Sequence, residues 1–411
     1  MAKTIVFCAD GTWNGPDQDD QVQDGHAPTN GQGLQAQLTN VCKLFAWLSG
    51  DLQPKGAAWG GLEMEKVLVD AATGQRVQIA KYVHGVGDST KLPDRIVGGA
   101  FGVGVTARIA RGYTYISRNY VAGDRIVIVG FSRGAYTARA LAGLIAGEGL
   151  LRPELAAEGD DTRFDTAAAA WYRWRYGRDS LFQKALDFGT ELLEWRSAFG
   201  KARQLTADSF VPVKIAAVAV WDTVGALGIP TYLGKGMSDI FRFCDTSLNP
   251  NVALGIHAVA LDEQRKAFGP TLWDDDPRIA QALFPGGHCD VGGGYAEHGL
   301  SDAPLLWVAD RLRQADVGLR FAAQQPCEVK PDSGSLRHCA WVEAPVWAGL
   351  GLAARDFPAS LILDDTVRQR MKNYGTAPEN VERAAQDPKR PYAPGNLPKS
   401  LAAPAPASPA P

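Results

Sequence analysis

A strand, a sharp turn and a helix follow one another without a break in DRIVIVGFSRGAYTARALAGLIAG, residues 124–147. The apolar run RIVIV is typical of a strand buried on both faces of a parallel sheet. GFSRG has the form GxSxG, in which a serine sits on a strained strand-to-helix bend. Gly130 and Gly134 flank it because a Cβ at either position would clash across so tight a turn. The feature predicts an α/β fold with Ser132 as a nucleophile, in preference to a Gly-flanked turn of a nucleotide-binding protein.

Other apolar runs of strand length alternate with helical stretches along the chain. Thr39 or Asn40 can cap a helix through VCKLFAWLSG, a second helix is expected near 105–121, and 51–77 is expected to be a polar connection. Alternating strands and helices predict a mostly parallel central sheet flanked by helices, the α/β-hydrolase fold when a nucleophile bend is present. The expected strands are TIVFC (4–8), VQIAKYVHG (77–85), VKIAAVAVWD (213–222), VALGIHAVALDE (252–263) and IAQALFPGGH (279–288).

A single catalytic domain is expected over 1–390, because α/β enzymes with insertions often reach such lengths as one unit. Residues 151–212 are rich in Ala and Trp and predict a helical insertion that could cap the active site. Its aromatic residues could line an acyl pocket or touch a bilayer, but their helical spacing favours core packing. The Pro/Ala-rich stretch 391–411 is expected to be a disordered or extended tail.

Composition excludes several classes of partner and cofactor. A formal net charge of -3 without a long Lys or Arg run leaves no electrostatic footprint for nucleic acid. The six cysteines are dispersed without a CxxC pair, so neither a disulfide framework nor a metal site is predicted. GVGD (85–88) and GGAFGVG (98–104) lack the lysine of a phosphate loop and the full dinucleotide pattern. No cofactor and no metal are expected.

The N-terminal run MAKTIVFCAD is too short for a signal-peptide core with a cleavage site. No stretch approaches the roughly 18 uninterrupted apolar residues of a spanning helix. We therefore expect a chain that is cytoplasmic in the producing cell and is not exported by the Sec route.

A serine hydroxyl needs a base, and in this fold the base follows the nucleophile and the acid along the chain. Among the six histidines, we favour His288 because FPGGHCDVGGGY is a Gly-rich loop directly after a predicted strand. His257 lies within an apolar strand pattern, which is more typical of a packed core residue. His298 and His338 lie in less distinctive surroundings.

Three carboxylates are candidates for the acid. Asp222 ends an apolar strand before a Gly-containing turn and looks placed to orient an imidazole, so it is favoured. Asp262 sits where the fold usually keeps its acid, but EQRK (263–266) predicts a solvated helix start with local ion pairs. Asp290 could instead bond the backbone N–H groups of its own Gly-rich loop. Asp262 and Asp290 stay open as alternatives.

The oxyanion hole is expected to use the backbone N–H of Arg133, the residue after the nucleophile, and a second N–H from the loop after the first strand. That loop is DGTWN (10–14), in which Gly11 and Thr12 are the candidate donors. For Asp10 itself, an Asx-turn that closes the strand is an equally good interpretation.

In combination and order, several separated motifs give the chain a specific resemblance over about 3–310. It resembles the α/β-hydrolase-domain family that includes the type VI secretion phospholipase effectors of Gram-negative bacteria. The resemblance implies a lipase-like core and a triad that falls on Ser132, Asp222 and His288. Those effectors are often longer, with an added membrane-binding portion. The motifs are FCADGTWN (7–14), GFSRGAYTAR (130–139), VWDTVGALG (220–228), HAVALDEQRKAF (257–268) and FPGGHCDVGGGY (284–295).

The function expected from these observations is that of a serine ester hydrolase, a phospholipase or lipase that works through an acyl-enzyme without a cofactor. The resemblance implies a lipid or other acyl-ester substrate, contact with a membrane surface, and release into target cells by a signal-independent route. It also implies an immunity protein or a component of the secretion apparatus as partners. A thioesterase or other carboxylesterase on the same triad, and a non-catalytic binding protein with this fold, stay open as alternatives.

Overall fold

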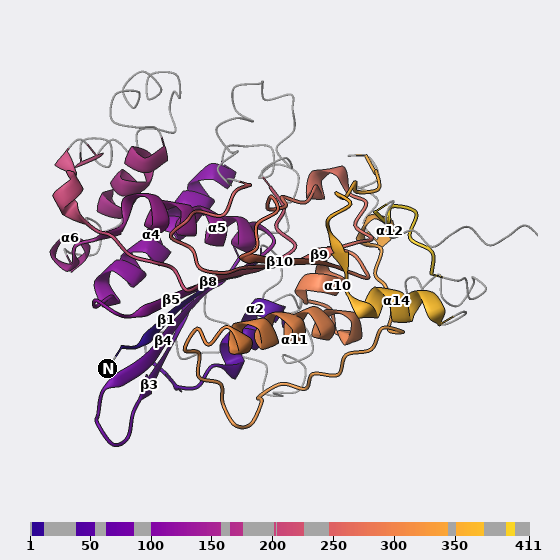
Figure 1. Ribbon diagram of the computed structural model, residues 1–411, viewed down its shortest axis with the longest axis horizontal. Helices are drawn as coiled ribbons and strands as arrows, with labels where there is room; N and C mark the ends of the chain where they lie inside the picture. The colour runs from indigo at the N-terminus through magenta and orange to yellow at the C-terminus, as the bar shows by residue number, and fades with distance from the viewer. Residues whose placement is uncertain are drawn as a thin grey trace, which may run out of the picture.

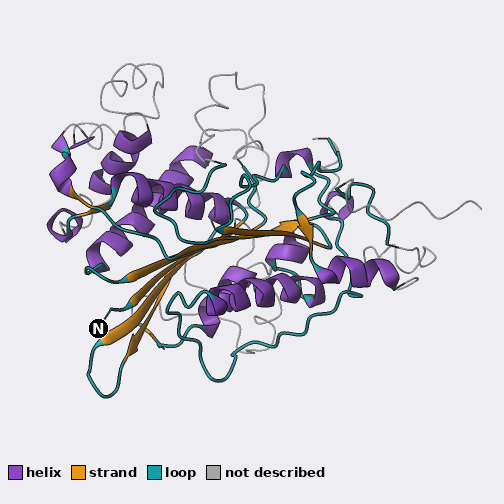
Figure 2. Cartoon of the chain, in the orientation of Figure 1, coloured by secondary structure: helices purple, strands orange, loops and turns teal. Residues whose placement is uncertain are grey.

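A nine-stranded sheet with helices on both faces forms the centre of the protein (Figures 1 and 2). The computed structural model describes residues 2–11, 38–53, 63–85, 100–157, 165–175, 201–202, 204–225, 246–343, 351–373 and 392–398. Neighbouring strands from β11 to β4 pair in parallel, whereas β3 and β2 add an antiparallel edge. In spatial order the strands are β11 (Ile362–Leu363), β10 (Ile279–Phe284), β9 (Gly255–Ala260), β8 (Ala217–Trp221), β5 (Arg125–Phe131), β1 (Thr4–Ala9), β4 (Arg76–Val83), β3 (Glu63–Val69) and β2 (Asp51–Leu52).

Two hydrophobic cores lie on the two faces of this sheet. Along β1, Ile5 and Phe7 enter the core under α4 and α5, whereas Val6 and Cys8 enter the core over α2 and α11. Successive side chains point to opposite faces of a strand, so a strand covered on both faces must be apolar throughout. This explains the continuous apolar runs and confirms the predicted mostly parallel sheet flanked by helices. The helices are α4 (Ala100–Asn119), α5 (Arg133–Glu148), α2 (Asn40–Trp47) and α11 (Gly299–Gln314).

The antiparallel edge differs from the polar connection expected over 51–77. In β3 (EMEKVLV) the first residues alternate between half-buried and buried, which suits a strand covered on one face, with the two-residue β2 at the edge beyond it. Lys66 turns inward, where its Nζ donates to the carbonyl oxygens of Ala46 and Leu48 at 2.7 and 2.9 Å. The buried lysine therefore satisfies carbonyl groups at the C-terminal end of α2.

The N-terminal ends of α2 and α4 can be compared with the helix starts predicted from the sequence. Thr39 is the N-cap of α2, and its side chain accepts a hydrogen bond from the Cys42 N–H at 3.1 Å, as predicted. Helix α4 begins at Ala100, inside the Gly-rich run 98–104 and five residues before the start of the helix expected near 105–121. Within the described ranges, no helix is both long and apolar enough to cross a membrane.

The described parts of 151–212 pack onto the α5 side of the sheet. β6 (Leu150–Leu151) pairs antiparallel with β7 (Phe210–Val211), next to α6 (Pro153–Ala157) and a short 3-10 helix, Ala207–Ser209. A helical stretch over 165–175 buries Trp171 and places the Trp174 indole against Gly143 and Gly147 of α5. These aromatic residues serve core packing, and much of the remaining segment lies outside the described residues. The cap over the active site stays a prediction.

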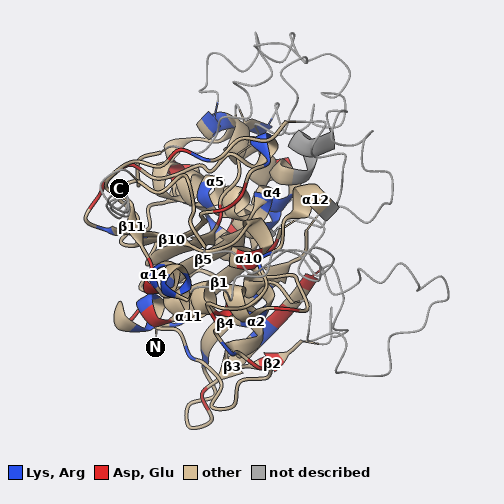
Figure 3. Cartoon of the chain, turned by 90° about the vertical axis from the view of Figure 1, so that its right-hand side faces the viewer, with Lys and Arg blue, Asp and Glu red and all other residues tan. Residues whose placement is uncertain are grey.

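Residues 392–398 differ from the extended tail expected from 391 onward. Tyr392 is buried, and its hydroxyl donates to Asp262 Oδ2 at 2.8 Å. Leu397 packs against the same small core of β9, β10 and α14 (Asp365–Lys372) side chains. Acidic and basic residues are interspersed over the described elements (Figure 3).

Candidate active site

Ser132 sits on the bend between β5 and α5, at the carboxyl end of a central strand. Its backbone has φ 59° and ψ -125°, a conformation that non-glycine residues rarely adopt. An ideal Cβ at Gly134 would lie 2.1 Å from the Ala9 oxygen, and one at Gly130 would lie 2.4 Å from the Gly134 oxygen. Both glycines are therefore required sterically, as the GxSxG pattern predicts.

The structure brings Ser132, His288 and Asp222 into one hydrogen-bonded chain. His288 Nε2 lies 2.7 Å from Ser132 Oγ, and His288 Nδ1 lies 2.6 Å from Asp222 Oδ2. Ser132 follows β5, Asp222 follows β8, and His288 begins the short helix α10 (His288–Gly292) after β10. Parallel strands end at the same edge of the sheet, which explains how residues far apart in sequence meet here. The arrangement can pass a proton from the serine to the imidazole.

Asp222 is fully buried and still ionises readily. Burial opposes the charged form, but Arg355 and the His288 hydrogen bond outweigh it and lower the pKa of Asp222 below its usual value. The Arg355 guanidinium contacts both carboxylate oxygens, at 2.7 and 3.0 Å, and the Ala260 N–H donates to Oδ1 at 2.9 Å. The Asp222 backbone has a φ of 35°, which is also a strained value. The carboxylate is thus held charged and in one orientation.

Two aromatic rings enclose the His288 imidazole. The Phe131 ring lies 4.6 Å from it at a tilt of 33°, and the Phe268 ring meets it edge-on at 4.9 Å. The resulting burial lowers the pKa of His288, and the hydrogen bond to Asp222 opposes this shift. At neutral pH the imidazole is therefore neutral, the form that can accept a proton from the serine.

The two alternative acids hold the loop that carries His288. Asp262 Oδ2 accepts the Gly286 N–H at 2.6 Å, and Asp290 Oδ2 accepts the Gly287 N–H at 2.9 Å. Asp290 Oδ1 also pairs with Nδ1 of His338 at 2.7 Å. The loop-binding role expected for Asp290 matches these bonds. The carboxylate that bonds the His288 imidazole is that of Asp222.

The solvated helix start expected over 263–266 is wrong, although its local ion pair is present. Glu263 is 1% exposed, and its Oε1 accepts from Arg265 Nε at 2.9 Å. Its Oε2 accepts the His288 N–H at 3.1 Å, so the pair helps to position α10. Arg265 also lies over the Phe268 ring, 3.6 Å from its centroid. Sequence reasoning missed this role because a charged run normally indicates a solvent-exposed face.

The predicted oxyanion donors have different outcomes. Arg133 is the first residue of α5, where backbone N–H groups point out of the helix N-terminus. The Gly11 N–H instead donates to its neighbour Asp10 Oδ1 at 2.7 Å, which corrects its assignment as a donor. Gly11 contributes space, because an added Cβ would lie 3.2 Å from Ser132 Cβ. Thr12 lies outside the described residues.

His257 is a core residue, as its strand pattern predicts. The Thr223 N–H donates to its Nε2 at 3.0 Å, and its Nδ1 lies 2.9 Å from Gln281 Oε1. Burial lowers the pKa of His257 to about 3. Among the described residues, no cluster of three or more His, Cys, Asp or Glu side chains could hold a metal ion.

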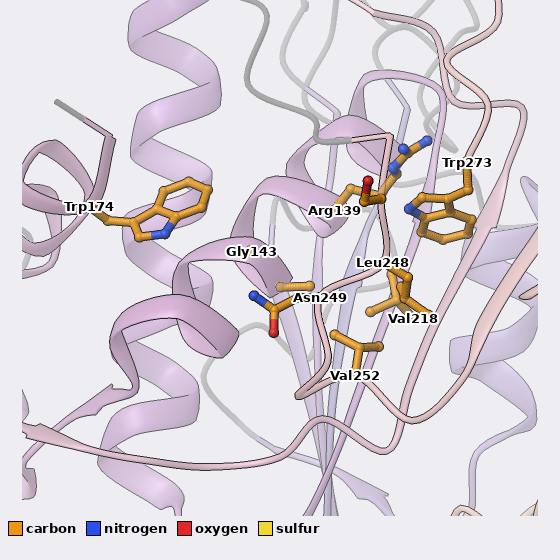
Figure 4. Close-up of a pocket in the computed structure, with 10 residues that line it drawn as sticks. Arg139, Gly143, Trp174, Val218, Leu248, Asn249, Val252 and Trp273 are labelled. Atoms are coloured by element: carbon orange, nitrogen blue, oxygen red, sulfur yellow. The ribbon is translucent and has the colours of Figure 1, made fainter. Parts of the chain in front are cut away.

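A cavity of about 40 Å³ opens elsewhere, between α5 and the strand β8 (Figure 4). Trp174, Trp273 and Arg139 are among its lining residues, and the Ser132, His288 and Asp222 side chains are not. Arg139 lies over the Trp273 ring, 4.4 Å from the centroid. The cavity is therefore separate from the hydrogen-bonded chain of Ser132.

A serine on a strand-to-helix bend, linked through a histidine to a buried carboxylate at the carboxyl edge of a parallel sheet, defines the class of α/β proteins with a Ser-His-Asp site. Residues 3–311 match the model of the family described as "T6SS, Phospholipase effector Tle1-like, catalytic domain". The chain belongs to this family.

Individual relatives are more distant. An uncharacterized protein of Saccharomyces cerevisiae, YEL023C, is 27% identical over 191 residues, which are 46% of this chain and 24% of the yeast protein. A crystal structure of an uncharacterized protein from Pseudomonas aeruginosa is 16% identical, with a TM-score of 0.43 over 86% of this chain and 51% of that one. The structure of the Tle1 effector bound to the VgrG spike from the type 6 secretion system is 17% identical, with a TM-score of 0.36 over 72% and 51%. The chain thus spans about half or less of the length of each.

Proposed function

We propose that the protein is a serine ester hydrolase of the α/β-hydrolase class that cleaves acyl esters of phospholipids. The observation that carries the proposal is the continuous hydrogen bonding from Ser132 Oγ through His288 to Asp222, with distances of 2.7 and 2.6 Å. A hydroxyl, a neutral imidazole and a charged carboxylate in this order are the parts of a general-base-activated nucleophile. Family membership supports the phospholipid as substrate.

In the proposed reaction, Ser132 Oγ attacks the acyl carbonyl while His288 Nε2 takes its proton. The Arg133 N–H and a second donor after β1 stabilise the oxyanion of the tetrahedral intermediate. His288 then returns the proton to the departing alcohol oxygen, the ester C–O bond breaks, and the acyl group remains on the serine. Water attacks the acyl-enzyme with His288 again as base, which releases the fatty acid and restores the hydroxyl. Asp222 holds the Nδ1–H tautomer and stabilises the imidazolium.

The biological setting proposed here follows from the same family. A type VI effector reaches its target cell through the secretion apparatus, so a component of that apparatus is the proposed delivery partner. Its substrate would be the target membrane, which requires contact with a lipid surface. A producing cell that makes such an enzyme needs an immunity protein, which is the third proposed partner.

The test compares Ser132→Ala with wild type and with the control variant Ser49→Ala. The Ser49 side chain lies outside the site. We expect Ser132→Ala to fold normally by circular dichroism and to lose at least about 1,000-fold in turnover of a short-chain p-nitrophenyl ester. It should also fail to release fatty acid from phospholipid vesicles, and Ser49→Ala should match wild type in both assays. Equal activity in Ser132→Ala and wild type would refute the nucleophile assignment.

A further inference from the structure

We propose that Arg355 is a positioning residue for the reaction, which acts through Asp222 from a segment beyond the family-matched part of the chain. The inference rests on the proposed function. It adds a fourth member to the site that neither the GxSxG pattern nor the other motifs identify.

The Arg355 guanidinium is fixed from several sides. Its Nη1 donates to Asp222 Oδ1 at 2.7 Å and its Nη2 donates to Oδ2 at 3.0 Å, a two-pronged contact with the carboxylate plane. Nη1 also donates to the Ala260 carbonyl at 2.7 Å, and Nη2 to the Phe268 carbonyl at 2.5 Å. The side chain is only 3% exposed. A guanidinium held by two carbonyl groups cannot turn away from the carboxylate without losing those two hydrogen bonds.

The contact reaches His288 through a shared oxygen. Asp222 Oδ2 lies 3.0 Å from Arg355 Nη2 and 2.6 Å from His288 Nδ1. Rotation of the carboxylate would break the geometry at both sides together, so the arginine fixes the direction from which the imidazole is held.

The backbone before Arg355 lies along the loop that follows β9. The Lys266 N–H donates to the Gly351 carbonyl at 3.2 Å, and the Ala353 N–H donates to the Gln264 carbonyl at 2.8 Å. Asn396 Nδ2 contacts the Arg355 carbonyl at 3.3 Å and the Leu261 carbonyl at 2.8 Å. The family match ends at residue 311. The segment 351–355 is therefore built into the back of the site, although the motifs that predicted the site end at Tyr295.

The charge of Arg355 has a consequence for proton uptake by the His288–Asp222 pair. The cation cancels part of the carboxylate field at the imidazole. Without it, Asp222 would stabilise the imidazolium more strongly, and the pair would take up its proton at higher pH. The neutral imidazole is the active base, so the acidic limb of the kcat/KM profile would move upward in pH.

The groups that face His288 from neighbouring elements do not change in such a variant. Besides Arg355, the charged groups that act on the imidazole are Asp222, Glu263 and Arg265, and the Phe131 and Phe268 rings cover its faces. A shift of the acidic limb in an Arg355 variant therefore reports the loss of this one cation.

The experiment measures kcat and the pH dependence of kcat/KM, per folded molecule, for Arg355→Gln and Arg355→Lys. Arg368→Gln in α14 is the control, because the Arg368 side chain is half exposed and, within the described part of the chain, contacts Asp365 and the Leu363 carbonyl away from the site. For Arg355→Gln we expect a loss of about 100-fold in kcat and an upward shift of the acidic limb by about one pH unit. Arg355→Lys keeps the charge but not the two-pronged contact, so its limb should stay and its kcat should recover in part.

The double variant Asp222→Asn/Arg355→Gln removes both charges together, which keeps the test decisive if Arg355→Gln alone does not fold. The proposal predicts that this variant has the same kcat as Asp222→Asn, since Arg355 acts only through Asp222. A further loss of kcat beyond Asp222→Asn would show that Arg355 acts independently and would overturn the proposal. A wild-type kcat and pH profile in Arg355→Gln would do the same. Activity in Ser132→Ala would instead overturn the proposed function itself.

Discussion

Replacing Asp222 by Asn tests which carboxylate orients the base. The change preserves shape but removes the charge, and the new amide NH₂ can face His288 Nδ1 and favour the tautomer with its proton on Nε2. That tautomer cannot accept the Ser132 proton. The amide oxygen in the place of Oδ1 still accepts from Arg355 Nη1 and the Ala260 N–H, but the NH₂ in the place of Oδ2 faces Arg355 Nη2, so two donors oppose each other.

The magnitude has two parts. Loss of the correct tautomer in a serine triad lowers kcat by about 10⁴, which corresponds to about 5.5 kcal/mol of transition-state stabilisation. Asp222 is 0% exposed, so the variant also leaves the buried Arg355 cation without its partner. Breaking one side of a buried ion pair typically costs about 3–5 kcal/mol of stability. We therefore expect Asp222→Asn to be both inactive and less stable than wild type.

The assay compares Asp222→Asn with Asp262→Asn and Asp290→Asn. Turnover of a p-nitrophenyl ester is measured per folded molecule, and urea denaturation gives the free energy of unfolding. The latter two carboxylates bind the loop before α10, so their variants should lose less than about 10-fold in kcat while they lose about 1–3 kcal/mol of stability. Wild-type turnover in Asp222→Asn, or a deeper loss of kcat in either comparison variant, would refute the assignment of the acid.

Three further predictions concern the base, the bend and a helix cap. Burial lowers the pKa of His288 below its usual 6.5. In a profile of wild-type kcat/KM from about pH 4 to 9, the activity should therefore fall only below pH 6.5. A midpoint of this fall above pH 6.5 would contradict a base that is neutral at neutral pH. Gly134→Ala places a Cβ 2.1 Å from the Ala9 oxygen and should lower the free energy of unfolding, measured by thermal unfolding, by at least about 3 kcal/mol. The control Gly74→Ala, in open space at φ +67°, should lower it by only about 1–2 kcal/mol. Thr39→Ala removes the α2 cap and the hydrogen bond from Thr39 Oγ1 to the buried Asp10 Oδ2 at 2.6 Å. It should lower the unfolding free energy in urea by about 2–4 kcal/mol, and an unchanged value would contradict both contributions.

The parallel centre of the fold follows from local patterns. Each strand buried on both faces must be apolar throughout, so β1, β5, β8, β9 and β10 were all recognisable as runs. β3, next to the edge strand β2, was not recognisable, because it has one covered face and its charged residues resemble a loop. Lys66 shows why: its ammonium group donates to carbonyl groups at the end of α2, a contact between elements that no local pattern reveals.

The site divides in the same way. Ser132 and His288 lie on turns whose glycines are required sterically, and Asp222 ends an apolar strand. The local sequence around each of these residues therefore predicts its place in the site. Arg355 carries none, because a single arginine in a segment far from the motifs resembles any surface residue. The Gly11 N–H was assigned as a donor from its place after β1, but the adjacent Asp10 carboxylate accepts it.

The central claim is that the Ser132 hydroxyl is the activated nucleophile. Fluorophosphonate labelling followed by peptide mass spectrometry tests it directly, because the reagent forms a covalent bond only with a serine made nucleophilic by its base. The account predicts one adduct, on the peptide that contains Ser132, and its loss in His288→Ala. An unlabelled Ser132, or an adduct on another serine that survives His288→Ala, would contradict it.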